Sequence, residues 1–432
     1  MQAHLVPNWT TSVRETYEFR TIIFTSENGR EQRSADRMTP RRQISFSPQL
    51  YGPALRQFKN LMHDRGAAEI TIADPARFGI SLLEDAEAGA EEITVGPVAP
   101  WMDEGIQIAL SGFFAAEQIG LEAVAAVSSF SSAYSSGFGG GRAVITLATP
   151  LQSTWPAGTE VRPVLRGRLP QSVDASFITD QHAEAAVTFA VDPPSNVPVL
   201  AAGLEHSLFQ GRPVLLAKPN WVSAVSIQFD TAYEQVDYQR GIIANYLPIE
   251  YAARISQFNY MDVASADIAS LLALFVDMKG RRGEFWSPSW VTDFIPASQV
   301  TSGATTFVVR GTDTYHSYAD STVNNAIAIM KGDGSWIFAE VEEMSLVSSA
   351  SGGAFSSGYS DGFDAPLSDQ FTQITVSSPF EETVARKDIA MVCWLNLCRF
   401  ASDTLTLDWR SDNLAQCLAN IMTLETNAVE EM

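Results

Sequence analysis

The sequence has few charged residues, few basic residues, few cysteines and no long apolar run. Charged side chains make up 18% of its 432 residues, below the roughly 25% that is usual for globular domains. A protein that exposes its whole surface to water normally carries more charge. We therefore expect much of this surface to be buried against other protein chains.

The shortage of basic residues limits the kinds of partner. There are 28 Lys and Arg residues against 50 Asp and Glu residues, which gives a formal net charge of −22. Nucleic-acid binding requires a basic face that neutralises phosphates, so the sequence argues against nucleic acid as the main partner. Beyond that, acidity indicates only solubility and mutual repulsion.

Cysteine is nearly absent. Cys393, Cys398 and Cys417 all lie in the second half of the chain, so no disulfide framework is shared by the two halves. We predict three buried, reduced thiols and a reducing compartment. Cys393 and Cys398 do not complete a zinc site, because there is no second pair of ligands at the required spacing.

No segment has the sequence of a membrane span or a signal peptide. The longest apolar run, 268–276, is interrupted by one serine and is far shorter than the ~20 residues that a spanning helix needs. At the start of the chain, His4, Asn8 and Trp9 interrupt any apolar core. We therefore expect neither a span nor a signal peptide.

Known catalytic and ligand-binding signatures are missing as well. The 5 histidines show no metal-ligand spacing, and there is no HExxH, EF-hand, P-loop, Rossmann or GxSxG pattern. We expect no catalytic residue, no metal site and no cofactor. Asp361, Asp364 and Asp369 leave calcium binding by the stretch 361–369 open, although a solvated loop is the simpler interpretation.

What the chain does contain is a second copy of its own pattern. Pro7-Asn8-Trp9 returns as Pro219-Asn220-Trp221, 212 positions later. Further matches keep the same order while the offset drifts to 232: Arg42 and Phe46 with Arg254 and Phe258, Gly89-Ala90 with Gly303-Ala304, Ile145-Thr146-Leu147 with Ile374-Thr375-Val376, and Thr179-Asp180-Gln181 with Ser411-Asp412-Asn413. Collinear matches of this kind predict an internal duplication.

The duplication predicts three parts. The first repeat covers 1–192, a linker covers 193–212, and the second repeat, with longer loops, covers 213–432. Pro193-Pro194 opens the linker, and adjacent prolines stiffen a chain and remove hydrogen-bond donors.

Alternation of apolar and polar residues is the dominant local pattern. Tyr17 and Phe19 alternate with Glu18 and Arg20, which is typical of a half-buried strand. Further strands are predicted at 70–72, 93–95, 145–147, 187–189, 225–230, 307–309, 374–376 and 405–407. The predicted class is mainly β (α+β), with two tandem duplicated β-sandwich or barrel-like domains, each with one flanking helix.

Helical periodicity is confined to a few segments. Apolar residues recur at helical spacing in 53–64 and in 265–279, and Gly66 and Gly280 or Gly283 are suited to end these helices. The Ala-rich stretch 113–127 is a further helix candidate, although its counterpart near 336–346 lacks a helical pattern. Because repeated segments should share one structure, 179–191 and 411–424 are both predicted to be closing strands.

Aromatic residues supply the candidate interface. Ser/Gly-rich stretches at 128–141 and 347–364 carry aromatics and are predicted to contact a neighbour. The candidate interface residues are Trp9, Trp221, Tyr134, Phe138, Phe355, Tyr359 and Phe363. A second group, Trp286, Trp290, Tyr315, Tyr318 and Trp336, either packs in the core or forms platforms that stack sugars or anchor proteins.

The Pro-Asn-Trp motif, the strand-helix order with its glycine stop, the SSGF and SSGY stretches and the segment Gly211–Trp221 resemble tail-tip proteins of long-tailed bacteriophages, in the distal tail or baseplate group. The resemblance implies a structural protein, not an enzyme, that is made in the host cytoplasm and built into the virion tail. It implies assembly into a ring, with other tail proteins such as tube, hub or fibre proteins as neighbours. The duplication then predicts a ring of three or six chains.

Two other functions stay open at this point. One is a receptor- or glycan-binding module of a virion that uses the aromatics of the second half. The other is a cell-wall hydrolase whose paired carboxylates are distant in the sequence and close in space.

Overall fold

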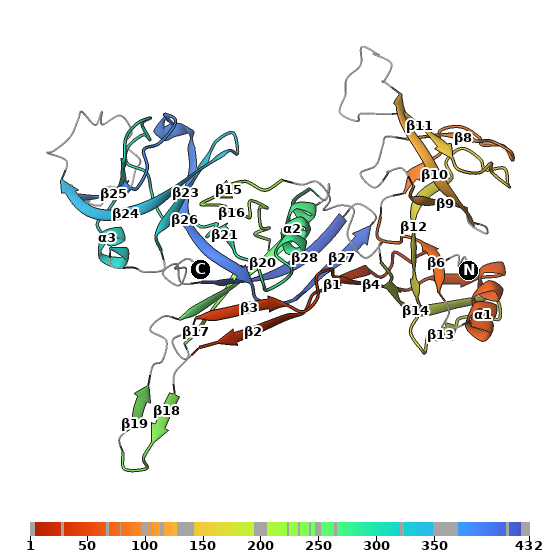
Figure 1. Cartoon of the computed structure of the whole chain (residues 1–432), viewed down its shortest axis with the longest axis horizontal. Coiled ribbons are helices and arrows are strands. Elements are labelled where there is room, and N and C mark those ends of the chain that lie inside the picture. The colour runs from red at the N-terminus through yellow and green to blue at the C-terminus, as the bar shows by residue number, and fades with distance from the viewer. Residues whose placement is uncertain are drawn as a thin grey trace.

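The structure is a computed structural model. It describes residues 5–26, 30–65, 69–77, 79–96, 102, 105–112, 116–127, 142–193, 205–222, 224–231, 234–241, 243–246, 252–262, 266–319, 321, 324–348, 370–411 and 414–424. The protein is mainly β, and 22 strands of this part of the chain join into one large sheet (Figure 1).

The first half of the chain contains one helix and a succession of strands. They are β1 (Val13–Glu18), β2 (Thr21–Thr25), β3 (Glu31–Ala35), β4 (Arg41–Phe46), β5 (Gln49–Tyr51), α1 (Pro53–Arg65), β6 (Ile70–Ala73), β7 (Ile80–Ser81), β8 (Glu92–Val95), β9 (Gln107–Ser111), β10 (Ala116–Val127), β11 (Arg142–Leu147), β12 (Glu160–Arg168), β13 (Asp174–Phe177) and β14 (His182–Val191).

The second half begins with the short hairpin β15 (Leu208–Phe209) and β16 (Arg212–Pro213). It continues through β17 (Ser226–Asp230), β18 (Glu234–Asp237), β19 (Ile243–Tyr246), β20 (Ala253–Asp262), α2 (Ala266–Asp277), β21 (Phe285–Pro288), β22 (Thr306–Arg310), α3 (Asp313–Tyr318), β23 (Ala326–Lys331), β24 (Trp336–Ser348), β25 (Gln370–Val376), the 3-10 turn η3 (Arg386–Asp388), β26 (Ile389–Phe400), β27 (Thr404–Ser411) and β28 (Leu414–Thr423).

A row of eight antiparallel strands crosses both halves. Its order is β17, β20, β28, β27, β1, β4, β14 and β13. Strand β26 pairs with β28, on the same side as β27. Strand β12 pairs with β14, on the same side as β13. Among the described residues, β17 and β13 each pair with one strand only, so each leaves an outer edge.

A smaller β-module stands on each end of this row (Figure 1). Strands β7 to β11 pair with one another and with β12 around a core that includes Ile93, Ile145 and Val161. Strands β22 to β25 form the other module, and β23 pairs with β26 around a core that includes Phe307 and Ile374.

The main hydrophobic core draws on both halves. The apolar stripe of α1, including Leu55 and Phe58, and that of α2, including Leu271 and Phe275, belong to one cluster of buried side chains. Two hairpins leave the main sheet at matching places, β2–β3 between β1 and β4, and β18–β19 between β17 and β20. In Figure 1 the β18–β19 hairpin projects away from the body.

Most of the predicted elements are confirmed. The segments 53–64 and 265–279 correspond to α1 and α2, and every predicted strand has its counterpart, including the closing strands β14 and β28. Gly280 follows α2 with φ +69° and donates its amide to Phe275, as a C-terminal glycine does. Gly66 lies outside the described residues.

Two predictions about helices are wrong. Residues 116–127 of the Ala-rich stretch form strand β10, paired with β9 and β11. Alanine favours a helix, but pairing with strands on both sides overrides this weak local preference. The second half also has more than one helix, because the six-residue α3 follows β22.

The cysteine prediction is confirmed, since Cys393, Cys398 and Cys417 are free and buried. Burial raises the pKa of the Cys393 and Cys398 thiols to about 12, which keeps them protonated. No helix in the described part of the chain has the length and apolar character of a membrane span.

Close packing of β12 on β14 gives a test of this architecture. A Cβ atom at Gly167 would overlap the carbonyl oxygen of Ala190 and lie 2.8 Å from the ring of Phe189. We expect Gly167→Ala to lower the free energy of unfolding by about 1–3 kcal/mol, because the clash is with backbone. Denaturant unfolding measures this. Gly96→Ala is the control, since no atom lies within 4 Å of its added Cβ; equal losses in the two variants would contradict the packing.

Candidate functional site

A dense group of polar contacts in the described part of the chain lies where the two halves join. Strand β1 of the first half pairs with β27 of the second half, from Val13 opposite Trp409 to Glu18 opposite Thr404. The inward face of β1 presents Val13, Glu15 and Tyr17, all fully buried. A carboxylate therefore occupies a core position, where a charge needs partners to be tolerated.

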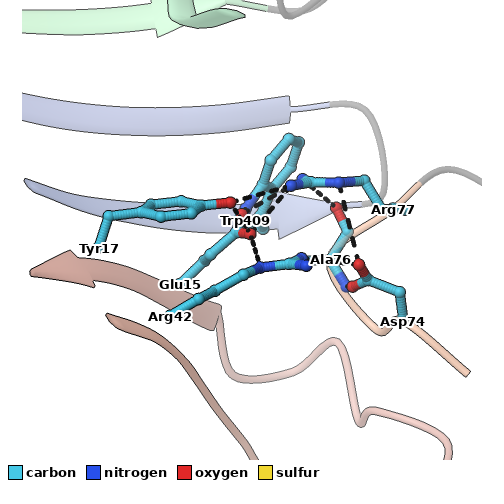
Figure 2. Close-up of polar contacts among 7 residues, drawn as sticks. All are labelled: Glu15, Tyr17, Arg42, Asp74, Ala76, Arg77 and Trp409. Carbon is cyan, nitrogen blue, oxygen red and sulfur yellow. Dashed lines mark hydrogen bonds and ion pairs between the residues drawn. The ribbon is translucent and has the colours of Figure 1, made fainter. Parts of the chain in front are cut away.

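Glu15 has those partners on all sides (Figure 2). Its Oε1 accepts hydrogen bonds from Tyr17 Oη at 2.5 Å, Arg42 Nε at 2.7 Å and an Arg77 guanidinium nitrogen at 2.9 Å. Its Oε2 accepts from Arg77 at 3.2 Å and from the indole Nε1 of Trp409 at 3.0 Å. The last bond is the direct polar link to the second half.

A second carboxylate completes the cluster. Asp74, in the turn after β6, accepts a hydrogen bond from Arg42 at 2.7 Å and from the amide of Ala76 at 2.9 Å. Arg77 also lies with its guanidinium carbon 5.6 Å from the centre of the Trp409 ring, in a cation–π contact. Two arginines thus balance two carboxylates, and none of the four side chains is more than 4% exposed.

The electrostatics of the cluster fix its charges. Burial alone raises the pKa of Glu15, but Arg77 and Arg42, with hydrogen bonds from Tyr17 and Trp409, outweigh it and lower the pKa from 4.5 to about 2. Burial, together with Glu15, raises the pKa of Tyr17 well above its usual range. Glu15 stays ionised, Tyr17 stays protonated, and both oxygens of Glu15 are fully engaged. The cluster is built to hold strands together rather than to exchange protons with a substrate.

A second contact between the halves comes from the β2–β3 hairpin. Asp403, in the turn before β27, accepts hydrogen bonds from the amide and hydroxyl of Thr21, both at 2.8 Å, and from the amide of Arg281 at 2.9 Å. Glu31 holds Arg399 through two bonds of 2.8 and 2.9 Å, and Arg33 pairs with Glu284. The β2–β3 hairpin, called the β2–β3 arm below, thus belongs to the first half and binds the second half through hydrogen bonds and ion pairs.

Two of the seven predicted interface residues, Trp9 and Trp221, lie in the described part of the chain. Trp9 is partly buried against the main core, whereas Trp221 is 50% exposed. The other five, Tyr134, Phe138, Phe355, Tyr359 and Phe363, lie outside the described residues, as does the acidic stretch 361–369. The interface prediction for these positions stays a prediction.

The second aromatic group packs inside the molecule where the structure describes it. Trp286 is 2% and Trp290 is 5% exposed, and Trp290 makes an edge contact with Trp336 at 5.6 Å between ring centres. Tyr318 packs edge-on against Trp394. Tyr315, Tyr318 and Trp336 are partly buried and pack against the hydrophobic clusters.

A pocket with a volume of about 480 Å³ lies between the start of α1 and the loop before β12. Among the described residues that line it, Glu160 supplies the only carboxylate and Tyr51 the only aromatic ring. Glu160 is also paired with Arg162. The two facing carboxylates that glycoside hydrolysis requires are not found among those lining residues.

Sequence reasoning missed the cluster around Glu15. One signal in the sequence could have found it. Side chains alternate between the two faces of a strand, so Glu15 shares a face with Val13 and Tyr17. A charged residue on an apolar face indicates a buried ion pair. Arg42 was singled out only as a repeated residue. Nothing in the sequence indicates that Asp74, Arg77 and Trp409 meet it.

Within the described residues, no group of three or more His, Cys, Asp or Glu side chains is placed to hold a metal ion. A comparison with protein-family models gives no match for this chain, and a comparison with curated protein sequences gives none either.

Removal of the Glu15 charge tests the role of the cluster. We expect Glu15→Gln to lower the free energy of unfolding by about 3–5 kcal/mol, because it leaves two buried arginines with one carboxylate. Asp408→Asn is the matched control on the same strand pair, since Asp408 forms an exposed ion pair with Arg14 at 2.9 Å and exposed pairs contribute at most about 1 kcal/mol. Denaturant unfolding compares the two, and a similar loss in both would refute the assignment.

The lowered pKa of Glu15 also predicts a pH dependence. In the unfolded chain Glu15 titrates near 4.5 and in the folded protein near 2, so its contribution is complete above pH 4.5 and is lost as the pH falls towards 2. The full contribution is about 3 kcal/mol. We expect the stability difference between the native protein and Glu15→Gln to be constant at neutral pH and to narrow below pH 4.5. A constant difference down to pH 2.5 would contradict the shift.

Proposed function

We propose that the protein is a structural component of a phage tail tip or baseplate. In this proposal it forms a ring that connects the tail tube to tip proteins or fibres, and it is built into the virion tail from chains made in the host cytoplasm. The proposal includes the finer view of the fold, in which two duplicated β-sandwich or barrel-like units are joined in tandem.

The order of strand pairs supports the duplication. In the first half the pairs are β1–β4, β4–β14, β14–β13, β14–β12 and β12–β6. In the second half, β17–β20, β20–β28, β28–β27, β28–β26 and β26–β21 follow in the same order. Two unrelated domains would not be expected to share every one of these antiparallel pairs.

Individual backbone hydrogen bonds agree as well, at the offsets that the sequence repeat gives. Three pairs of bonds illustrate this: Asn8 to Ser47 and Asn220 to Asn259 (2.8 and 2.6 Å), Gly89 to Leu151 and Gly303 to Phe380 (2.7 and 2.8 Å), and Ala86 to Trp155 and Val300 to Val384 (2.8 and 3.0 Å). In each bond the first residue donates its amide to the carbonyl oxygen of the second. The sequence matches thus coincide with matched backbone geometry.

The single observation that carries the ring is the junction between β1 and β27. In the duplicated view β27 is the counterpart of β13, so the two units meet through different edges, head to tail. Contacts of this heterologous kind generate closed rings when the rotation closes. A junction of this type within one chain also leaves the two complementary edges, β17 and β13, at the ends of the row.

Duplication also suits a structure that joins partners of different symmetry. Three chains would present six similar units, which could connect a six-fold tube to a three-fold tip. Six chains would form a ring in which the second units occupy a different radius. The low charged fraction of 18% fits a protein that is largely buried among such partners.

The mass and symmetry of the purified protein test the proposed function. We expect a ring of three or six chains with a central hole, that is, three or six times the 47.0 kDa chain mass. Native mass spectrometry and class averages from negative-stain electron microscopy measure this. A monomer at micromolar concentration and physiological salt would refute the ring.

A further inference from the structure

The outer strand β17 has apolar side chains exposed at positions that are buried elsewhere in the sheet. It pairs with β20 from Ser226 opposite Gln257, as β1 pairs with β4 from Arg14 opposite Ser45. In this register Ile227 and Phe229 correspond to positions 15 and 17 of β1, where the side chains are fully buried. Ile227 is 50% exposed and Phe229 is 68% exposed.

Strand β13, at the other end of the row, has the complementary exposure. Ala175 lies opposite Ala185 in β14, as Leu407 lies opposite Cys417 in β28. Phe177 therefore holds the position that Trp409 holds in β27. Trp409 is 2% exposed because β1 covers it, whereas Phe177 is 53% exposed.

A pocket lies beside β17 at the place where the first half holds its ion cluster. It has a volume of about 170 Å³, and Ile227, Arg254, Ser289 and Asp293 contribute to its lining. A cavity of roughly 150 Å³ accommodates one benzene molecule, so the pocket is of the size of a phenyl ring.

The residues of the pocket match those of the cluster by position. Arg254 corresponds to Arg42 by the sequence repeat. Ser289 corresponds to Asp74 by its backbone bond: the amide of Ser289 donates to the carbonyl oxygen of Trp394 in β26 at 2.9 Å, as the amide of Asp74 donates to that of Pro163 in β12 at 2.8 Å. Among the described residues, Nε of Arg254 is buried without a hydrogen-bond partner. In the described part of the chain β17 pairs only with β20, so no strand covers this pocket as β27 covers the ion cluster; we call the pocket the socket.

We propose that β13 of one chain pairs with β17 of a second copy of this chain and places Phe177 in that pocket. The junction repeats between chains the pairing that β27 and β1 make within a chain. The inference rests on the proposed function, because it names the two surfaces that build the proposed ring.

The internal junction sets the register of this contact. Trp409 lies opposite Val13, and Asp408 lies opposite Arg14. The same register places Phe177 opposite Val225, Ser176 opposite Ser226, Ala175 opposite Ile227 and Val173 opposite Phe229. Every exposed apolar residue of one strand then faces an apolar residue of the other, and the serines share the outer face.

A second copy is the occupant that the geometry favours over an unrelated partner. An exposed strand edge with apolar side chains is a template for pairing that proteins normally cover. The two edges lie far apart along the row in Figure 1, so one chain cannot join its own β13 to its own β17. Each chain has one free edge of β13 and one free edge of β17, so the β13 edge of one copy can pair with the β17 edge of the next copy.

Disulfide trapping tests the proposed register in the full-length protein. Opposite residues of antiparallel strands lie about 4.5–5.5 Å apart between Cα atoms, within the range that a disulfide spans. We expect the double variant Ser176→Cys and Ser226→Cys to form chains linked end to end under mild oxidation. The native cysteines are buried. Each single variant, and the shifted pair Ser176→Cys with Gln228→Cys, are the controls and should give much less product.

Substitutions in the apolar pair test the same contact without a cross-link. Phe177→Ser and Phe229→Ser change exposed side chains, so the chain should fold with an unchanged melting temperature. We expect self-association at least about tenfold weaker by analytical ultracentrifugation. Phe24→Ser is the control for the loss of an exposed phenyl ring, since Phe24 is 67% exposed on β2, which pairs with β3 and has no part in the proposed strand pairing.

The outcomes separate this inference from the proposed function. If rings persist in both Phe variants and the double cysteine variant gives no cross-link, the β13–β17 contact is overturned and the proposed ring is not. Cross-linked open fibres that dissociate in the Phe variants would support the contact and overturn the closed ring. A native protein that is monomeric and never cross-links would overturn both.

Discussion

The arrangement of the two halves depends on one buried carboxylate. Glu15 lies in the core of the strand row, with both oxygens engaged by side chains from β1, β4, the turn after β6 and β27. Desolvating four charged groups is expensive, and apolar residues of similar volume would often be as stable. What the cluster supplies is selectivity. A strand added at this edge of β1 is favoured if it donates a second hydrogen bond to Oε2 of Glu15, beside the bond from Arg77 at 3.2 Å. Trp409 does so with its indole N–H at 3.0 Å.

This interaction joins residues separated by 394 positions in the chain. Strand β1 is therefore made long before its partner β27, and the buried cluster cannot be completed until nearly the whole chain is present. Pairings of such long range are slow to form, because the chain must close a large loop before the contact stabilises it. The β2–β3 arm adds contacts of the same range through Glu31, Arg33 and Thr21. In the row, the β1–β27 pair joins four strands of the first half to four strands of the second half.

The local pattern of the sequence was enough to predict the elements but not the junction. Alternation located the strands, because one face of each is apolar, and glycine marked the end of α2. The Ala-rich residues 116–127 were misassigned because helix propensity is weak beside the hydrogen bonds that β9 and β11 supply. Glu15 was overlooked because a charge in an alternating strand is normally assigned to the outer face, although its parity places it inside. The partners of Glu15 come from separate elements, and no spacing in the sequence records that they meet.

The proposed contact between chains is chemically distinct from the contact within a chain. Position 15 carries a carboxylate and its counterpart is Ile227; Trp409 carries an N–H donor and its counterpart is Phe177. In the proposed register, Phe177 has no donor and suits the socket beside Ile227. If Phe177 were placed instead against β1, Oε2 of Glu15 would lose its indole donor and keep only the hydrogen bond from Arg77 at 3.2 Å. Trp409 against β17 would meet Ile227 at the position that Glu15 holds in β1. A hydrogen bond to a charged group contributes about 1.5–3 kcal/mol, so the edge of β1 favours Trp409 over Phe177. This difference would keep the internal junction from exchanging with the proposed junction between chains.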